Sequence, residues 1–267
     1  MAKSHIDAAV ARWSNRIAVL VVCGFLLLPL FAVVISSFNS ANNFRFPPEG
    51  FSFRWYEEAF AGTAWAESLQ FSALLALMVV PFVVVLGTLG GYAVAAGDFR
   101  GRGLLSSLFL APMAVPGVML GLALLYQLQT WGLVGSTTGI WLAHLVVSFP
   151  FCVRVVAVSA ASIDPQLVRA ARSLGASELR AFLTVTVPLL RPGIIAGAFL
   201  TTVVSLGEVA TSVFVSGSNT VTVPVRIYSA AQVQIEPTIA AVSTLLLVAS
   251  VLAIALIDRF FNVSRLL

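Results

Sequence analysis

Four polar residues in an apolar stretch have types and spacing that could act on a solute: Thr201, Ser205, Glu208 and Ser212. They follow one another at steps of four, three and four residues, so a continuous helix over Gly193–Val215 would carry them on one face. Counted from the start of that helix, Glu208 lies about 22 Å along it, past the middle of a bilayer toward the outside. A carboxylate at that depth is costly in hydrocarbon. The face is therefore expected either to line a translocation pathway that tolerates cations or to hold Glu208 by hydrogen bonds to a neighbouring helix.

A second polar segment, Ser162–Ile194, is a cationic insert in this apolar chain. Its acids are Asp164 and Glu178. Against them stand four arginines: Arg169, Arg172, Arg180 and Arg191. Such a segment between membrane spans suits docking to a soluble partner on the cytoplasmic side, although an ordinary charged interhelical loop has a similar composition.

Two short helices with a break between them are predicted in this segment. Asp164 is a plausible N-cap, with Pro165 at the first helical position, where a missing N–H costs nothing. Gly175 can adopt the left-handed conformation that ends the first helix. Ser177 can cap the second helix, which is expected to run toward Pro188.

The composition places both groups of residues in a membrane protein. The 267-residue chain is 59% hydrophobic and only 10% charged, whereas soluble domains contain about 25% charged residues. No soluble domain of this length could bury so much apolar surface, so we predict an all-α polytopic membrane protein. The sequence pI near 9.6 does not indicate nucleic-acid binding, because the arginines lie mostly in loops, as orientation signals do.

Six apolar stretches are long enough to cross about 30 Å of hydrocarbon as helices. They are Ile17–Phe38, Leu69–Ala96, Leu104–Leu128, Gly139–Ala160, Gly193–Val215 and Thr238–Phe260. The first follows Arg12 and Arg16 and could pass for a signal peptide. Its apolar run is long and has no clear small-x-small cleavage pattern, so a retained span is expected.

The positive charges predict how these spans are oriented. With the N-terminus in the cytoplasm, the inside segments hold 11 Lys and Arg residues and the outside segments hold 3, with Arg154 left near the inner end of the fourth span. The three outside cations are Arg45, Arg54 and Arg226. The positive-inside rule therefore places both termini and the Ser162–Ile194 segment in the cytoplasm.

The long outside loop, Asn39–Glu67, contains a predicted short amphipathic helix at Arg54–Phe60. Its Trp55 and Tyr56 suit a membrane interface. The loop is expected either to contact an external binding protein or to anchor itself through these aromatic side chains.

Small residues inside the spans predict close helix contacts. Gly87 with Gly91, and Gly117 with Gly121, each form a small-xxx-small pair. The two cysteines, Cys23 and Cys152, lie in apolar spans and are expected to be inert small hydrophobes.

The chain lacks the residues that ATP binding, metal binding and triad catalysis would need. Lys3 is the only lysine, so no Walker A lysine exists and this chain does not bind ATP through a P-loop. The only histidines are His5 and His144, with no carboxylate or cysteine cluster nearby, which argues against a metal site or a catalytic triad. We therefore expect no enzymatic activity, no bound metal and no cofactor.

The cationic segment also contains a recognisable order of small residues. Ala170-Ala171, Gly175-Ala176-Ser177, Val187-Pro188 and Pro192-Gly193-Ile194 resemble the EAA loop of the membrane permease subunits of binding-protein-dependent ABC importers, over about 25 residues. In that family the loop inserts as a coupling helix into a cleft on the ATPase subunit. The resemblance therefore implies six coupling residues here: Arg169, Ala170, Ala171, Gly175, Ala176 and Ser177. Arg169 stands where the family usually has the glutamate of EAA.

The length of the chain and the spacing of its spans also resemble the type I permease fold. That fold has six transmembrane helices, which here would make residues 1–267 a single permease domain with the coupling loop at about 162–194. The resemblance further implies a site in the bacterial cytoplasmic (inner) membrane. It implies an ATP-binding subunit dimer, a second permease subunit that is expected to form a heterodimer with this chain, and an extracytoplasmic solute-binding protein. ATP hydrolysis would take place in the separate ATP-binding subunits.

Among such permeases, the chain is most similar to the shorter permease of spermidine/putrescine importers, so a polyamine is the expected solute. Related permeases for aminoalkylphosphonates and ferric iron are the alternatives in the same class. A self-sufficient secondary transporter is a further alternative, but buried ion ligands and internal repeats would be expected of it, and Glu208 is the one obvious candidate. An intramembrane enzyme is disfavoured by the absence of a catalytic constellation.

Overall fold

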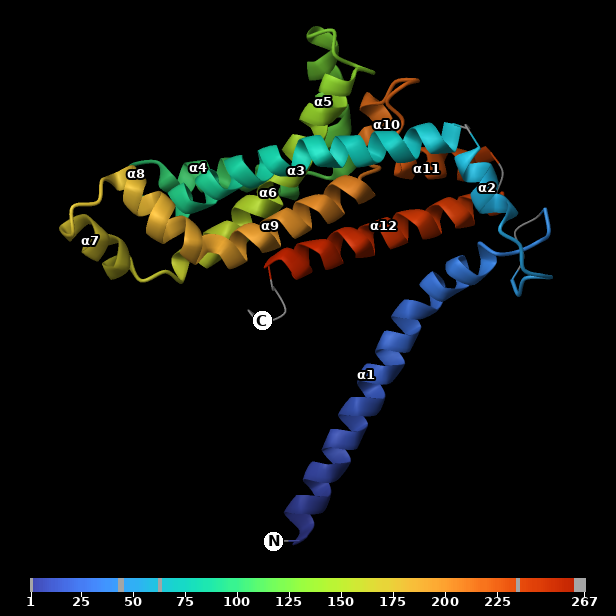
Figure 1. Ribbon diagram of the computed structural model, residues 1–267, viewed down its shortest axis with the longest axis horizontal. Helices are drawn as coiled ribbons and strands as arrows, with labels where there is room; N and C mark the ends of the chain where they lie inside the picture. Colours follow the sequence, from blue (N-terminus) through green and yellow to red (C-terminus); the bar gives the residue numbers. More distant parts are fainter. Residues whose placement is uncertain (1, 43–45, 62–63, 234–235, 262–267) are drawn as a thin grey trace. The chain divides into compact units, whose positions relative to one another are not determined.

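The computed structural model describes residues 2–42, 46–61, 64–233 and 236–261 (Figure 1). Arg45 and Arg265, which contribute to the predicted orientation, lie outside the described residues. The chain divides into two units, one made of Met1–Thr63 with Ala230–Leu245 and the other of Ala64–Ser229 with Leu246–Leu267. Within the described ranges the regular structure is helical, as predicted, with one isolated β-bridge between Asn39 and Phe51.

The first unit contains α1 (Ala2–Ser36), α2 (Arg54–Phe60) and the first part of α12 (Pro237–Phe261). The second unit contains most of the helices. They are α3 (Ala64–Ala96), α4 (Arg102–Ala114), α5 (Gly117–Thr130), α6 (Thr137–Ala161), α7 (Pro165–Ser173), α8 (Glu178–Ala181), η1 (Phe182–Thr186), α9 (Val187–Gly207) and α10 (Ser212–Val215). The next helix, α11 (Val223–Val233), begins in the second unit.

The long loop of the first unit folds around aromatic side chains. The predicted helix at Arg54–Phe60 is confirmed as α2. Trp55 is buried and donates its indole N–H to the carbonyl oxygen of Asn39 at 2.7 Å, while the Tyr56 and Ser37 hydroxyls form a hydrogen bond. Trp55 therefore holds the loop against Asn39, the residue at which the loop begins, and does not lie free at a membrane interface.

The number of spans is consistent with the six predicted, but two of them differ in form. Four described runs are long and apolar enough to cross a bilayer alone: Asn15–Ser36, α3, α6 and Glu178–Gly207. Helices α4 and α5 count as a fifth span if this bent pair is taken as one, and α12 covers the predicted sixth stretch.

The expectation of one straight helix over Leu104–Leu128 is wrong. Helix α4 ends at Ala114, and α5 begins at Gly117 after a bend of 106°. Val115 is extended, with φ −90° and ψ 131°. The following residue, Pro116, disfavours the helical conformation at Val115, which is the local reason for the break.

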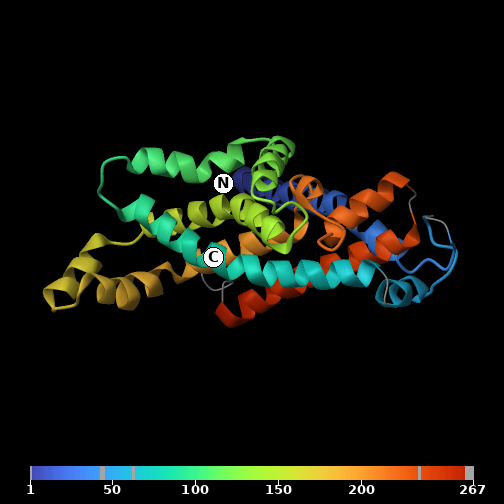
Figure 2. The same ribbon diagram turned by 90° about the horizontal axis from the view of Figure 1, so that it is seen from above.

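Helices α3, α6 and α9 pack side by side as the core of the second unit (Figures 1 and 2). Gly87 and Gly91 of α3 make the contact with α6. A Cβ atom on Gly87 would stand 2.6 Å from the Cys152 sulfur, and one on Gly91 would stand 2.9 Å from Val156. The predicted close contact is confirmed, and the pairing of 87 with 152 and 91 with 156 shows that α3 and α6 run parallel.

Glycines of α9 also pack against α6. A Cβ atom on Gly197 would stand 2.7 Å from the Cys152 sulfur, and one on Gly193 would overlap Ser159. Because the residue number rises along α9 as it falls along α6, these two helices are antiparallel. Cys152 is thus buried between two glycines. This close approach gains dispersion contacts that larger side chains would prevent.

The predicted helix over Gly193–Val215 is wrong at both ends. At its start the chain runs without a loop from α8 through the π-helical η1 into α9, so the second loop helix does not stop at Pro188. Pro188 lies in the first turn of α9, directly after η1. At its far end α9 stops at Gly207, and Glu208 is extended, with φ −73° and ψ 118°.

The glycine contacts predict that Gly87→Ala destabilises the protein. A methyl group there has no room beside Cys152 without a shift of α3 or α6, which typically costs about 1–3 kcal/mol. Gly103→Ala is the matched control, because a Cβ atom on this helical glycine meets nothing within 4 Å. Thermal unfolding in detergent should show a lower Tm for Gly87→Ala only. Equal midpoints for the two variants would contradict the packing described here.

Candidate functional site

The cationic loop folds as its sequence signals predict. The Asp164 carboxylate accepts a hydrogen bond from the Gln166 N–H at 2.8 Å, which caps α7 with Pro165 in the first helical turn. The Ser177 hydroxyl accepts from the Arg180 N–H at 3.3 Å and caps α8. Both caps are confirmed, because each depends only on residues two or three positions apart.

Gly175 ends α7 in the left-handed conformation, with φ 90°. Its N–H donates to the Arg172 carbonyl at 2.9 Å, and the Ala176 N–H donates to the Ala171 carbonyl at 3.1 Å. This pair of bonds is the Schellman motif. A Cβ atom on Gly175 would meet nothing within 4 Å, so the constraint at this position is the backbone angle and not a lack of space.

An ion pair joins the two loop helices. The Arg172 guanidinium lies 2.8 Å from the Glu178 carboxylate, across the turn at Gly175. Both side chains are at least half exposed, so the pair adds little to stability.

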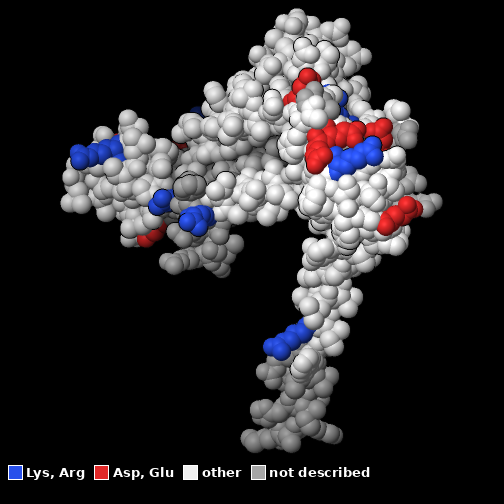
Figure 3. Space-filling model, turned by 45° about the vertical axis from the view of Figure 1, so that its right-hand side comes forward, with Lys and Arg blue, Asp and Glu red and all other residues white. Residues whose placement is uncertain are grey.

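The loop presents an exposed surface that mixes cations with leucines. Arg169 and Ala170 are exposed, and α7 buries none of its residues. Leu174 is 89% exposed and Leu179 is 68% exposed. Figure 3 shows basic side chains at this end of the second unit. Exposed leucines beside arginines, on a helical pair with fixed caps, are typical of a protein-docking surface.

The four polar residues predicted on one helix face lie in two separate helices and the break between them. Thr201 is buried in α9 and donates to the Gly197 carbonyl of its own helix at 2.8 Å. Ser205 lies near the end of α9, Glu208 lies in the break, and Ser212 starts α10. The single-face arrangement is wrong, because the chain leaves the helical path after Gly207.

Ser205 and Ser212 nevertheless meet, through a residue that the sequence analysis did not assign to the site. The His144 imidazole of α6 is buried, with Nδ1 3.0 Å from the Ser205 hydroxyl and Nε2 2.9 Å from the Ser212 hydroxyl. Its position inside an apolar span was the available signal, since a polar side chain there needs partners.

Glu208 is the half-buried member of the set. One of its carboxylate oxygens accepts a hydrogen bond from the Thr211 N–H at 2.7 Å and closes the turn before α10. Helix α5 supports this turn through glycines. A Cβ atom on Gly117 would stand 2.9 Å from Ala210, and one on Gly121 would stand 2.7 Å from Phe214. The close contact predicted for this glycine pair is confirmed.

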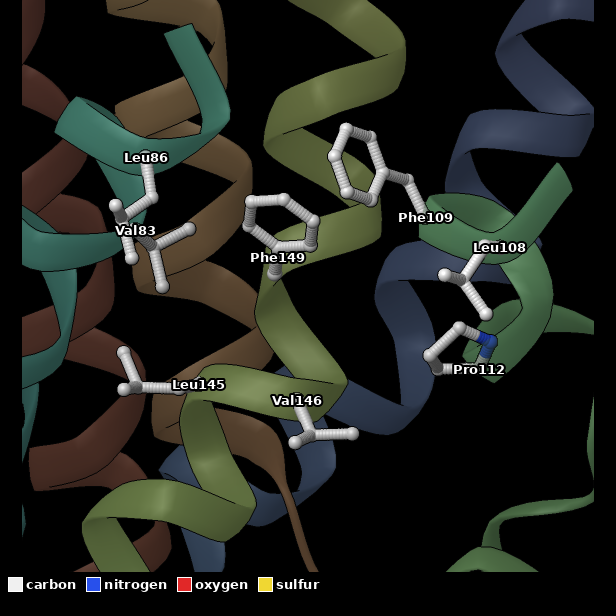
Figure 4. Close-up of a pocket in the computed structure, with 8 residues that line it drawn as sticks. All are labelled: Val83, Leu86, Leu108, Phe109, Pro112, Leu145, Val146 and Phe149. Atoms are coloured by element: carbon white, nitrogen blue, oxygen red, sulfur yellow. The ribbon is translucent and has the colours of Figure 1, made fainter. Parts of the chain in front are cut away.

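A cavity in the second unit lies between α3, α4 and α6 and has a volume of about 300 Å³. Its lining is entirely apolar (Figure 4): Val83, Leu86, Leu108, Phe109, Pro112, Leu145, Val146 and Phe149. A polar solute would find no hydrogen-bond donor or acceptor among these side chains. The break at Glu208 therefore remains the better candidate for solute contact.

Known proteins share both the sequence pattern and the fold. Residues 84–264 match the family model described as "Binding-protein-dependent transport system inner membrane component". The spermidine/putrescine transport system permease protein PotC of Escherichia coli (strain K12) is 28% identical over 236 residues, which cover 87% of this chain and 88% of PotC. The putrescine transport system permease protein PotI of the same strain is 32% identical over 234 residues, covering 84% and 82%.

The fold is also found in a solved structure. A chain of a bacterial ABC transporter involved in the import of the acidic polysaccharide alginate superposes with a TM-score of 0.73, at 15% identity, over 93% of this chain and 95% of that one. The expected kind of protein, a multi-pass permease subunit of an ABC importer in the inner membrane, is confirmed. This chain belongs to the family of binding-protein-dependent transport system inner membrane components.

Proposed function

We propose that this chain forms half of the translocation pathway of an ATP-driven polyamine importer. The observation that carries the proposal is the half-buried Glu208 carboxylate, which stands on a helix break inside an apolar unit. The relative PotC is named as a spermidine/putrescine permease and PotI as a putrescine permease. A carboxylate attracts an ammonium group strongly where water is scarce. The same carboxylate would repel the phosphonate of an aminoalkylphosphonate, so a polyamine is favoured over that alternative.

The proposed partners are an ATP-binding subunit dimer, a second permease subunit in a heterodimer, and an extracytoplasmic solute-binding protein. In this proposal the ATP-binding subunit dimer hydrolyses ATP. The coupling surface is the helical pair α7–α8 with Arg169, Ala170, Ala171, Gly175, Ala176 and Ser177. Its support is the exposed, capped geometry of this pair, which offers leucines and arginines to a partner.

The helix that follows the coupling surface suggests how a movement there would reach the solute. From Glu178 to Gly207 the chain is helical without a loop, a distance of about 45 Å at 1.5 Å per residue. One end belongs to the coupling pair and the other end adjoins Glu208. A shift or rotation of α7–α8 would therefore move the break directly. In this mechanism Thr201, Ser205 and Ser212 shape the pathway wall, and Glu208 contacts the solute.

The proposed topology has both termini and α7–α8 in the cytoplasm and residues 1–267 in one permease domain. In a Cys23→Ser background, cysteines placed at Glu49 and at Ser218, both exposed, should react with an impermeant thiol reagent added to intact cells, and a cysteine at Gln166 should not. Cys152 can be left in place because it is buried. External labelling at position 166 would refute this orientation.

Gly175→Leu should abolish coupled transport. Leucine opposes the left-handed backbone of the Schellman turn, which costs roughly 1–2 kcal/mol, and it adds bulk to the docking surface. Solute-stimulated ATP hydrolysis of the purified complex should fall at least about tenfold, while membrane insertion is retained. Gly132→Leu is the matched control, because Gly132 also has a positive φ and open space. Normal coupled ATPase activity in Gly175→Leu would show that this loop does not transmit the signal.

Glu208→Gln tests the solute contact. Glutamine keeps an acceptor for the Thr211 N–H and removes the charge, so the break should persist while uptake of labelled spermidine falls about tenfold, or ~1.4 kcal/mol in transition-state free energy. Glu208→Ala removes both the charge and the cap, and should also lower the Tm. Uptake at the wild-type rate by Glu208→Gln would remove this residue from the solute pathway.

A further inference from the structure

His144 makes contacts that the proposed transport mechanism does not yet use. Its ring lies on α6, yet its two nitrogens bind hydroxyls on either side of the break, Ser205 at 3.0 Å and Ser212 at 2.9 Å. A neutral imidazole has one donor and one acceptor, and a serine hydroxyl can serve as either. Both nitrogens are therefore satisfied in either tautomer.

The ring bridges two points that are seven residues apart in the sequence. Between them the chain is extended at Glu208 and turns before α10. Both serines are buried. A hydrogen bond in such surroundings is costly to leave unmade. The imidazole thus fixes the entry and the exit of the break to one side chain of α6.

Other contacts also support the break, from different sides. The Glu208 carboxylate caps the Thr211 N–H from within the segment. Helix α5 supports it from outside, where the Thr211 hydroxyl lies 3.5 Å from the Gly117 carbonyl. The bridge joins Ser205 on one flank and Ser212 on the other to a single side chain of α6, which packs on α3 and α9 in the core.

We propose that His144 is a positioning residue that holds the segment between Ser205 and Ser212 in place and so sets where the Glu208 carboxylate stands. Its link to solute transport rests on the function proposed above. The positioning role of His144 does not depend on which solute is transported. Without the two hydrogen bonds, the segment between Ser205 and Ser212 opens more often to water.

The test measures that opening without any solute. In a Cys23→Ser background, Val209→Cys places a thiol beside Glu208 while keeping its carboxylate. The purified complex is treated with a charged methanethiosulfonate reagent. His144→Leu should raise the rate of modification at 209 about tenfold, because two hydrogen bonds that hold the closed segment are lost. A thiol at the exposed Ser218, beyond α10, should react at an unchanged rate.

Ser148→Ala is the matched control for removing a buried polar atom from α6. Ser148 lies one turn beyond His144, is fully buried, and has a hydroxyl without a hydrogen-bond partner among the described residues. Its loss should change the rate at 209 by less than about twofold. Ser212→Ala gives a second route if His144→Leu does not assemble. It should raise the rate in the same direction, and less than additively when the two changes are combined.

Two results would overturn the inference. One is an unchanged rate at 209 in both His144→Leu and Ser212→Ala. The other is an equal rise at 209 and 218, which would mean general loosening of the fold. The proposed function fails separately, through wild-type spermidine uptake by Glu208→Gln. A raised rate at 209 together with that result would leave His144 as a positioning residue and remove the polyamine contact.

Discussion

The close approach of α6 and α9 at Cys152 determines the rest of the site. Gly197 leaves room for the Cys152 sulfur, and this contact fixes the register of two antiparallel helices. Eight residues back along α6 is His144, and eight residues forward along α9 is Ser205, so the same register places the imidazole at the end of α9. A larger residue at 197 would separate the helices and also shift the hydrogen bond. Packing of small residues therefore positions the polar ones.

The sequence predicted features whose causes are local. The caps at Asp164 and Ser177 and the turn at Gly175 each depend on residues within five positions, and all three appear in the structure. The close helix contacts at the glycine pairs could also be predicted from the sequence, because small residues four positions apart are typical of sites where two helices touch. These signals describe how a segment folds, whichever segments surround it.

The breaks in the predicted helices were not expected, because the apolar sequence pattern continues through them. The apolar run around Glu208 continues to Val215, so the pattern favoured one helix although the chain turns at Gly207. Metal and triad chemistry at His144 would need a cluster of carboxylates or cysteines nearby in the sequence, and there is none. Its partners are 61 and 68 residues away in the sequence, and only the fold brings them together. A buried polar residue inside a span can thus be satisfied by hydroxyls that are distant in the sequence.

A helix break suits a carboxylate in this position for a physical reason. In a continuous helix the backbone N–H groups are used by carbonyls one turn earlier, and a carboxylate can only project sideways. The extended backbone at Glu208 leaves the Thr211 N–H available, and the carboxylate accepts it. That hydrogen bond offsets part of the cost of holding a charge among apolar residues. The break therefore stabilises the carboxylate at the end of the long helix that begins at Glu178.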